Sequence, residues 1–216
     1  MIPLQFALRR RMMMAGGGGA PIADLPLGAL INIGTDGGAG TPNYEIADED
    51  NLVSGGVVLV RKNIHSNSPF GRLTTYPGGT LDSKMTSIYN SYPETLKSKI
   101  MDATFALRES GSITRKVFAP TYTMVGFGVN SGVTEGKALQ LYKSNASRIK
   151  ILDGEAGRWF LSSFGNADLT QIVYTDGTSY VARPDDRFGV VPTFVIPSKT
   201  SYDPTPNTDG SYNLIL

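Results

Sequence analysis

Short apolar runs, separated by clusters of glycine, asparagine, aspartate and serine, are the dominant pattern of this chain. Runs of this length between turn-forming residues are typical of β-strands. The run at 57–60 would be apolar on both faces of a strand, so we expect it to be central in a sheet. The strand-like runs are 30–33, 44–47, 57–60, 116–120, 158–161, 172–174 and 190–196.

Helical spacing occurs in one region, between the third and the fourth of these runs. Asp82 can cap a helix over residues 83–90, whose apolar residues recur at i, i+3 and i+4: Met85, Ile88 and Tyr89. A second short helix is expected to begin at Pro93. Its inward residues are expected to be Leu96, Ile100 and Phe105, and its outward residues Lys97 and Lys99. The order of strands, helices and strands predicts an α+β fold with segregated helices.

The N-terminal segment differs from the rest, because it places three arginines among apolar residues and follows them with glycines at 16–19. A secretory signal has its basic residues before the apolar stretch, whereas here they follow residues 6–8. We expect an arm over 1–20, disordered in the isolated chain and ordered when it docks on another subunit, followed by one domain over 21–216. The expected docking residues are Leu4, Phe6, Leu8, Arg9, Arg10, Arg11 and Met12.

Composition excludes several kinds of chemistry. The 216 residues contain no cysteine, which rules out disulfides, thiolate metal sites and cysteine nucleophiles. His65 is the one histidine, so a site that needs several histidines is impossible, and we expect His65 to be exposed or to be a hydrogen-bonded structural residue. The formal charge of +1 gives no basic footprint for nucleic acid. No apolar run reaches the ~18 residues that span a bilayer, so membrane insertion is not expected.

One glycine-rich segment and two acidic segments could be considered as ligand-binding sites, but the residues around them argue against binding. The stretch 34–40 lacks the following helix that a phosphate-binding fingerprint requires. The acidic runs 48–50 and 185–186 contain carboxylates that calcium or a glycosidase would need. Adjacent residues of a strand point to opposite faces, however, and both runs lie among turn-forming residues. No metal site, cofactor or catalytic residue is therefore expected.

Several short motifs follow one another in an order that resembles an uncharacterised domain family found in gut Firmicutes and their phages. Family members typically read W-W-L-R-S-P, then a D-G turn, then G-V-R-P-A. The resemblance covers residues 27–216 and implies a C-type-lectin-like fold, shared with formylglycine-generating enzymes, with short strands and two short helices. The motifs are Tyr44-Glu45-Ile46, Val58-Leu59-Val60, the helix pair over 81–105, Lys116-Val117-Phe118-Ala119-Pro120, Glu135-Gly136-Lys137-Ala138-Leu139, Arg158-Trp159-Phe160-Leu161-Ser162-Ser163, Asp176-Gly177 and Gly189-Val190-Val191-Pro192.

Departures from the family pattern favour structural roles. This chain has Phe160, Ser162 and Val191 where the family often has tryptophan, arginine and arginine. It lacks the copper-binding cysteines of the formylglycine-generating relatives, and the Glu-Pro-Asn, Gln-Pro-Asp and Trp-Asn-Asp motifs of calcium-dependent lectins. We therefore expect no enzymatic activity, and we expect Trp159 and Pro192 to be packing residues.

The resemblance implies a bacteriophage virion protein whose arm docks on other virion proteins, in a homo-oligomer, while the domain faces outward on a tail fibre, baseplate or head fibre. Its expected function is attachment to a host-surface glycan or protein through the segment 163–187, where aromatic and amide residues alternate. The expected binding residues are Phe164, Asn166, Asp168, Gln171, Tyr174 and Tyr180. The alternative is a purely structural virion protein, a capsid decoration or a fibre or neck joint that binds only other virion subunits. A small hydrolase is disfavoured, because no nucleophile and base can be paired.

Overall fold

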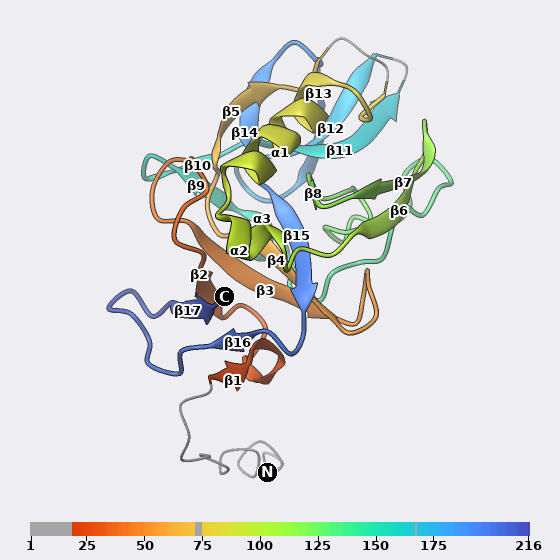
Figure 1. Ribbon diagram of the computed structural model, residues 1–216. Coiled ribbons are helices and arrows are strands. Elements are labelled where there is room, and N and C mark those ends of the chain that lie inside the picture. The colour runs from red at the N-terminus through yellow and green to blue at the C-terminus, as the bar shows by residue number, and fades with distance from the viewer. Residues whose placement is uncertain (1–18, 72–74, 167) are drawn as a thin grey trace, which may run out of the picture.

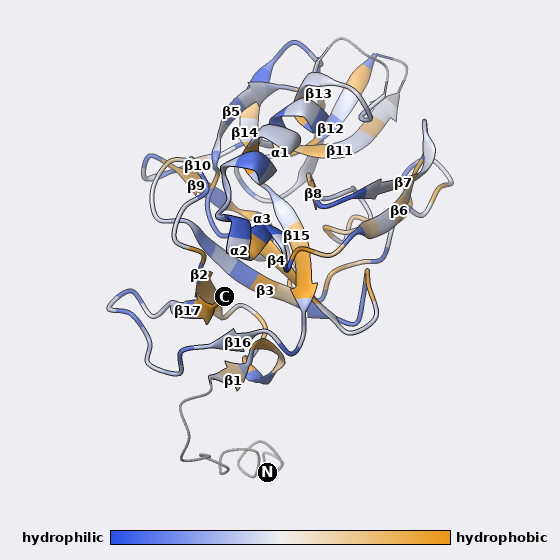
Figure 2. Cartoon of the chain, in the orientation of Figure 1, coloured by the Kyte–Doolittle hydropathy of each residue, from blue (hydrophilic) through white to orange (hydrophobic). Residues whose placement is uncertain are grey.

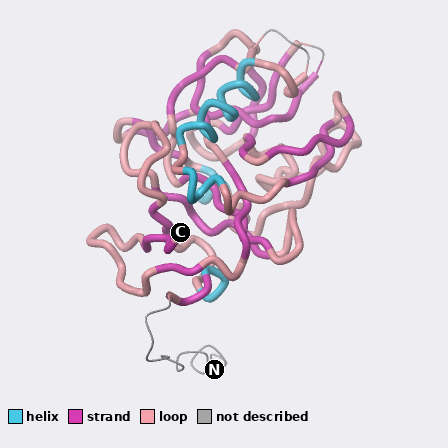
Figure 3. The backbone as a smooth tube through the Cα atoms, viewed as in Figure 1, coloured by secondary structure: helices cyan, strands magenta, loops and turns pink. Residues whose placement is uncertain are grey.

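The computed structural model describes residues 19–71, 75–166 and 168–216 (Figure 1). The predicted docking residues of the arm lie outside these ranges: Leu4, Phe6, Leu8, Arg9, Arg10, Arg11 and Met12. The described chain begins with a strand, β1 (Ala20–Pro21), in which Ala20 already pairs with Tyr202. The fold is sheet-rich with few helices, which agrees with the α+β prediction at that level (Figure 3).

An eight-stranded sheet forms the larger layer, in the order β1-β16-β17-β2-β3-β4-β15-β8. Its central strand β4 (Gly56–Arg61) is buried along its whole length between β3 (Asn43–Glu49) and β15 (Thr193–Pro197), which confirms the expectation for the run 57–60. The β3–β4 register shifts between Ile46 and Asp48, as in a β-bulge. The remaining strands of this sheet are β16 (Ser201–Tyr202), β17 (Tyr212–Ile215), β2 (Leu30–Asn32) and β8 (Val117–Phe118).

A five-stranded sheet forms the second layer, at the top of Figure 1. Its order is β13 (Ser179–Ala182), β12 (Leu169–Val173), β11 (Trp159–Asn166), β14 (Arg187–Val190) and β5 (Ser66–Pro69). Two further pairs of strands complete the described sheets: β6 (Ala103–Leu107) with β7 (Gly111–Arg115), and β9 (Lys150–Leu152) with β10 (Glu155–Gly157). The helix α1 (Thr80–Ser91) contacts both β5 and β8 and so lies between the two large sheets.

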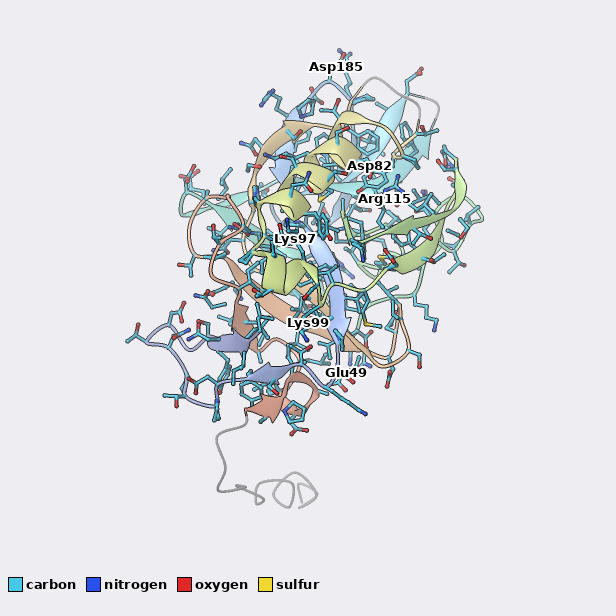
Figure 4. All side chains as sticks on the ribbon, viewed as in Figure 1. Glu49, Asp82, Lys97, Lys99, Arg115 and Asp185 are labelled. Atoms are coloured by element: carbon cyan, nitrogen blue, oxygen red, sulfur yellow. The ribbon has the colours of Figure 1, made fainter. Side chains whose placement is uncertain are left out.

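The helical region departs from the sequence prediction at its ends. The N-cap of α1 is Gly79, and Asp82 lies in the first turn, where it accepts a hydrogen bond from the Gly78 N–H. Its carboxylate also receives two 2.8 Å hydrogen bonds from Arg115, toward which it points in Figure 4. The second helix, α2 (Glu94–Lys97), is a single turn, so Phe105 belongs instead to β6. The 3₁₀ turn Ile22–Asp24 and α3 (Asn145–Arg148), which begins at a Ser144–Ser147 capping box, carry no apolar repeat that would predict them.

Trp159 and Phe160, at the start of β11, connect the cores on the two faces of the five-stranded sheet. Both are fully buried, and strand alternation directs them to opposite faces. The Trp159 indole N–H donates to the Arg148 carbonyl at 3.0 Å, whereas the Phe160 ring meets Phe70 edge-on at 5.7 Å between centroids. The packing role expected for Trp159 is confirmed. Figure 2 shows the hydrophobic residues gathered along interior strands such as β11 and β15.

The glycine-rich stretch 34–40 is fixed by a buried ion pair. Asp36 accepts a 2.5 Å hydrogen bond from Nε of Arg61, and the same guanidinium donates to the carbonyls of Ala39 and Ile64. His65 is buried against this stretch, with Nε2 2.8 Å from the Asp36 carbonyl, so the hydrogen-bonded structural role expected for it is confirmed. Asp36 and Arg61 thus anchor the stretch to the end of β4.

Truncation of Trp159 tests the core. We expect Trp159→Ala to lower the free energy of unfolding by about 3–5 kcal/mol, the usual range for deletion of a large aromatic residue, because it leaves a cavity and an unpaired Arg148 carbonyl. Tyr180→Ala, which truncates an exposed ring of the same sheet, should cost less than about 1.5 kcal/mol. Urea unfolding of both variants makes the comparison. A native Tm for Trp159→Ala together with a loss of binding would instead place Trp159 on a recognition surface.

The Asp36–Arg61 pair should make stability depend on pH. Burial alone would raise the pKa of Asp36, but its hydrogen bonds and the charge of Arg61 outweigh this effect and hold the pKa below its ordinary value. The ionised carboxylate therefore stabilises the fold above about pH 4, and this contribution is lost as the pH falls through the lowered pKa.

The matching variant is Asp36→Asn, which leaves a buried guanidinium without a counter-charge and should cost about 3–5 kcal/mol at neutral pH. Its deficit should shrink below about pH 4, where the wild-type carboxylate also becomes neutral. Glu94→Gln removes an exposed partner of Lys97 and should change stability by less than about 1 kcal/mol. Urea titrations at several pH values measure all three proteins, and a deficit that stays constant to strongly acidic pH would contradict this role for Asp36.

Candidate functional site

Four side chains form a partly exposed row on one face of the five-stranded sheet, and we call them the aromatic row: Tyr180, Tyr174, Arg158 and Phe188. Tyr180 is 62% exposed, and its ring lies 5.8 Å from that of Tyr174. The Arg158 guanidinium carbon lies 4.3 Å from the centre of the Tyr174 ring and 5.6 Å from that of Phe188. Each contact is within the range of aromatic pairing or cation–π attraction.

Strand register explains why residues so far apart in sequence share one face. Phe160 pairs with Ile172, and Ile172 pairs with Tyr180, so these three side chains point the same way. Tyr174 lies two residues beyond Ile172 and Arg158 two residues before Phe160, which keeps both on that face. Phe188 joins them from β14, where its neighbour Gly189 pairs in parallel with Trp159.

Gly189 permits this close approach of β14 to β11. A Cβ at this position would lie 2.7 Å from the Cδ1 atom of Ile64 and 2.9 Å from the Arg158 carbonyl oxygen. The Gly189 N–H donates to that same carbonyl at 2.8 Å. The strand that supplies Phe188 is therefore fixed directly to the backbone of Arg158.

A tight turn between β12 and β13 holds the two tyrosines at their spacing. The Tyr174 N–H donates to the Thr178 carbonyl, and Gly177 adopts a φ of 81° that favours glycine. The turn lies directly against α3, since a Cβ on Gly177 would lie 1.9 Å from the Asn145 carbonyl oxygen. The Asp176 carboxylate faces its own turn, where hydrogen bonds from the Thr178 side chain and backbone hold the pKa of Asp176 below its ordinary value.

The inner end of the aromatic row continues into the core. The Phe188 ring lies 5.3 Å from the buried Phe160 ring, which in turn meets Phe70. The core therefore supports the row at Phe188, while Arg158 and Tyr180 are exposed and Tyr174 is half-buried between them. Aromatic side chains held in this way can bind a partner without a large loss of conformational entropy.

The predicted binding residues divide into three groups. Tyr174 and Tyr180 are brought together as one surface. Asp168 is exposed in the turn between β11 and β12, Asn166 ends β11, and Gln171 is half-buried opposite Val181 on the other face of β12. The expectation that Phe164 lies on the surface is wrong.

Phe164 is 4% exposed and meets the Phe70 ring at a centroid distance of 5.0 Å. Its partner in the register is Thr170, two residues along β12 from Ile172, so it lies on the same face as Phe160 but beneath the covering segment that contains Phe70. Strand alternation thus buries a residue that composition alone placed in an exposed loop.

Sequence reasoning missed Arg158 and Phe188, which lie just outside the segment 163–187. Arg158 belongs to the run 158–161, and alternation within that run would place it on the same face as Phe160, whereas Phe188 lies two residues before the run 190–196. The pairing of β11 with β14 is what brings Arg158 to Phe188, and pairing between distant strands has no local sequence signal.

Ser163 and Glu135 form a buried hydroxyl–carboxylate pair. The Ser163 hydroxyl donates to the Glu135 carboxylate and accepts from the Tyr122 N–H. Burial raises the pKa of Glu135, although hydrogen bonds from Ser163, Arg108 and Asn130 oppose this effect. Both Ser163 and Glu135 are fully buried, so the pair ties the loop after β8 to β11 and has no surface that a substrate could reach.

The acidic runs considered for calcium act as local hydrogen-bond acceptors. Asp48 is buried, and its two oxygens accept from Gln140, Asn51 and the Glu49 N–H. Asp186 accepts from the Arg183 N–H within its turn. Within residues 19–71, 75–166 and 168–216, no group of three or more acidic or histidine side chains is placed to hold a metal ion.

Comparison with known proteins gives no assignment: no family model, curated protein or solved structure matches the chain. In the part of the chain that the structure describes, no helix has both the length and the apolar character needed to cross a bilayer. The aromatic row therefore has to be interpreted from its own chemistry.

Proposed function

We propose that this chain is an attachment module of a bacteriophage particle that binds the host surface through the aromatic row and catalyses no reaction. The observation that carries the proposal is the row itself: two tyrosines, an arginine and a phenylalanine in contact along one face of the five-stranded sheet, with Tyr180 and Arg158 exposed. Tyrosine and arginine are the residue types that dominate binding energy at interfaces. Their support by the core keeps them in place before a partner arrives.

The virion assignment rests on the resemblance in the sequence, and the strand pairing supports it. The motif residues 158–163 and 189–192 lie far apart in the chain, yet Trp159 pairs directly with Gly189. Two of the motifs that carry the resemblance therefore belong to one structural unit. We propose a C-type-lectin-like fold on this basis, with the segment 1–20 as the arm that docks on other virion proteins.

A purely structural virion protein is the second candidate, and one observation favours it. Ile215 and Leu216 are 49% and 41% exposed at the end of the C-terminal strand β17. The Cδ1 atom of Ile215 lies 2.5 Å from where a Cβ of Gly19 would be, so this apolar end adjoins the point where the arm leaves the domain. Exposed apolar residues at that point suit contacts between subunits. In this candidate function the aromatic row would also be covered by a virion subunit.

Adsorption of particles to host cells tests the proposal. Particles that carry Tyr174→Ala and Tyr180→Ala together should lose adsorption by about 30-fold or more, because truncation of an interface anchor typically costs 2 kcal/mol or more. Val129→Ala, which truncates another exposed apolar side chain, is the control and should adsorb normally. Normal adsorption of particles that carry the double variant would contradict the attachment function. Failure of the double variant to assemble into particles would favour the structural one.

A further inference from the structure

We infer that Arg158 is the anchor of a site for acidic sugars, in which its guanidinium binds a carboxylate or phosphate group and Tyr180 contacts the sugar ring. The inference rests on the proposed attachment function and names the class of ligand that this function would use. Three features support this site: the hydrogen bonds that the Arg158 guanidinium makes, its stacking, and the hydrogen bonding of Asp176 within the β12–β13 turn.

The Arg158 guanidinium has donor capacity that the described protein does not use. Arginine carries five N–H donors, and here one of them bonds to the Tyr174 hydroxyl at 2.7 Å. Among the described residues, no carboxylate forms an ion pair with Arg158. Arg61 and Arg115, by contrast, bind aspartates, and the Arg148 side chain donates to four backbone or side-chain oxygens.

Stacking fixes the Arg158 guanidinium before a ligand binds. The rings of Tyr174 and Phe188 both lie within cation–π distance of it, and the Tyr174 hydroxyl holds one of its nitrogens. A planar fork held in this way matches the two oxygens of a carboxylate or phosphate. Binding would then cost little further side-chain entropy.

The acidic residue of the β12–β13 turn, Asp176, is already hydrogen-bonded within that turn. Both hydrogen bonds to the Asp176 side chain come from Thr178, so this carboxylate is directed into its own turn. An external anion is therefore the partner that would complete the hydrogen bonding of Arg158.

The tyrosines favour a sugar as the carrier of the anionic group. Tyr180 presents an exposed ring with its phenolic hydroxyl beside the half-buried Tyr174 ring, which faces Arg158. A sugar ring offers the complementary pattern of C–H faces and hydroxyl groups, whereas an acidic peptide side chain offers no such face to Tyr180. The structure therefore assigns the row to an acidic glycan rather than to an acidic peptide.

Titration of the full-length chain with small sugars tests this inference, with binding followed by NMR. Glucuronic acid carries a carboxylate and glucose 6-phosphate carries a phosphate, so comparing them shows which anionic group is preferred. Glucose is the neutral control, and a hexaglutamate peptide represents an acidic peptide. We expect one or both acidic sugars to bind at least tenfold more tightly than glucose and than the peptide, with an affinity that falls as salt is added.

Variants of Arg158 test whether this side chain causes the preference for acidic sugars. Arg158→Gln should remove the preference for acidic over neutral sugar, and Arg158→Lys should weaken it because lysine lacks the planar fork. Arg187→Gln removes a neighbouring exposed charge on the opposite face of β14 and should leave the preference intact. Thermal unfolding of each variant verifies that the fold is retained.

Three results would overturn the inference: equal binding of glucose and the acidic sugars, a preference that survives in Arg158→Gln, or tighter binding of hexaglutamate. If one of these occurred while the tyrosine variants still lost adsorption, the attachment function would stand without an acidic ligand. If instead the acidic sugars bound through Arg158 but adsorption did not depend on the row, the site would stand and the attachment function would fail.

Discussion

The alternation of Trp159 and Phe160 at the start of β11 is the constraint on which the rest of the molecule depends. Two consecutive large aromatic residues are both fully buried, which requires a core on each face of the five-stranded sheet. On one face the Trp159 indole N–H donates to the Arg148 carbonyl, and on the other face the Phe160 ring packs against Phe70. The same alternation places Arg158 on the Phe160 face, so the packing of the core determines where the aromatic row lies.

Local sequence signals predicted those parts of the fold that depend on burial within one element. The apolar run of β4 predicted a central strand, the spacing of Met85 and Ile88 predicted α1, and Trp159 was predicted to be a core residue. The short length of α2 and the strand that contains Phe105 could not be predicted in the same way. The residues Pro93, Leu96 and Ile100 are also compatible with a helix longer than one turn. Tertiary pairing of β6 with β7 overrides that local preference.

The binding surface was predictable only in part, because it is assembled by register between strands. Tyr174 and Tyr180 flank a turn with a clear Asp-Gly signal, and the structure brings their rings together. Phe164 was predicted to be a binding residue on the same grounds of composition, yet it is buried. It pairs with Thr170, which lies two residues from Ile172 along β12. Arg158 reaches Phe188 through the parallel pairing of β11 with β14, which no local pattern specifies.

Photo-crosslinking from position 180 distinguishes most directly between recognition and assembly. A photoreactive residue in place of Tyr180, on particles mixed with host cells and then irradiated, would react with whatever lies against the exposed end of the aromatic row. We expect crosslinks to host-surface material that appear only after cells are added, and none of this kind from the same photoreactive residue in place of Val129. Crosslinks from position 180 to another virion subunit, formed before cells are present, would contradict this expectation.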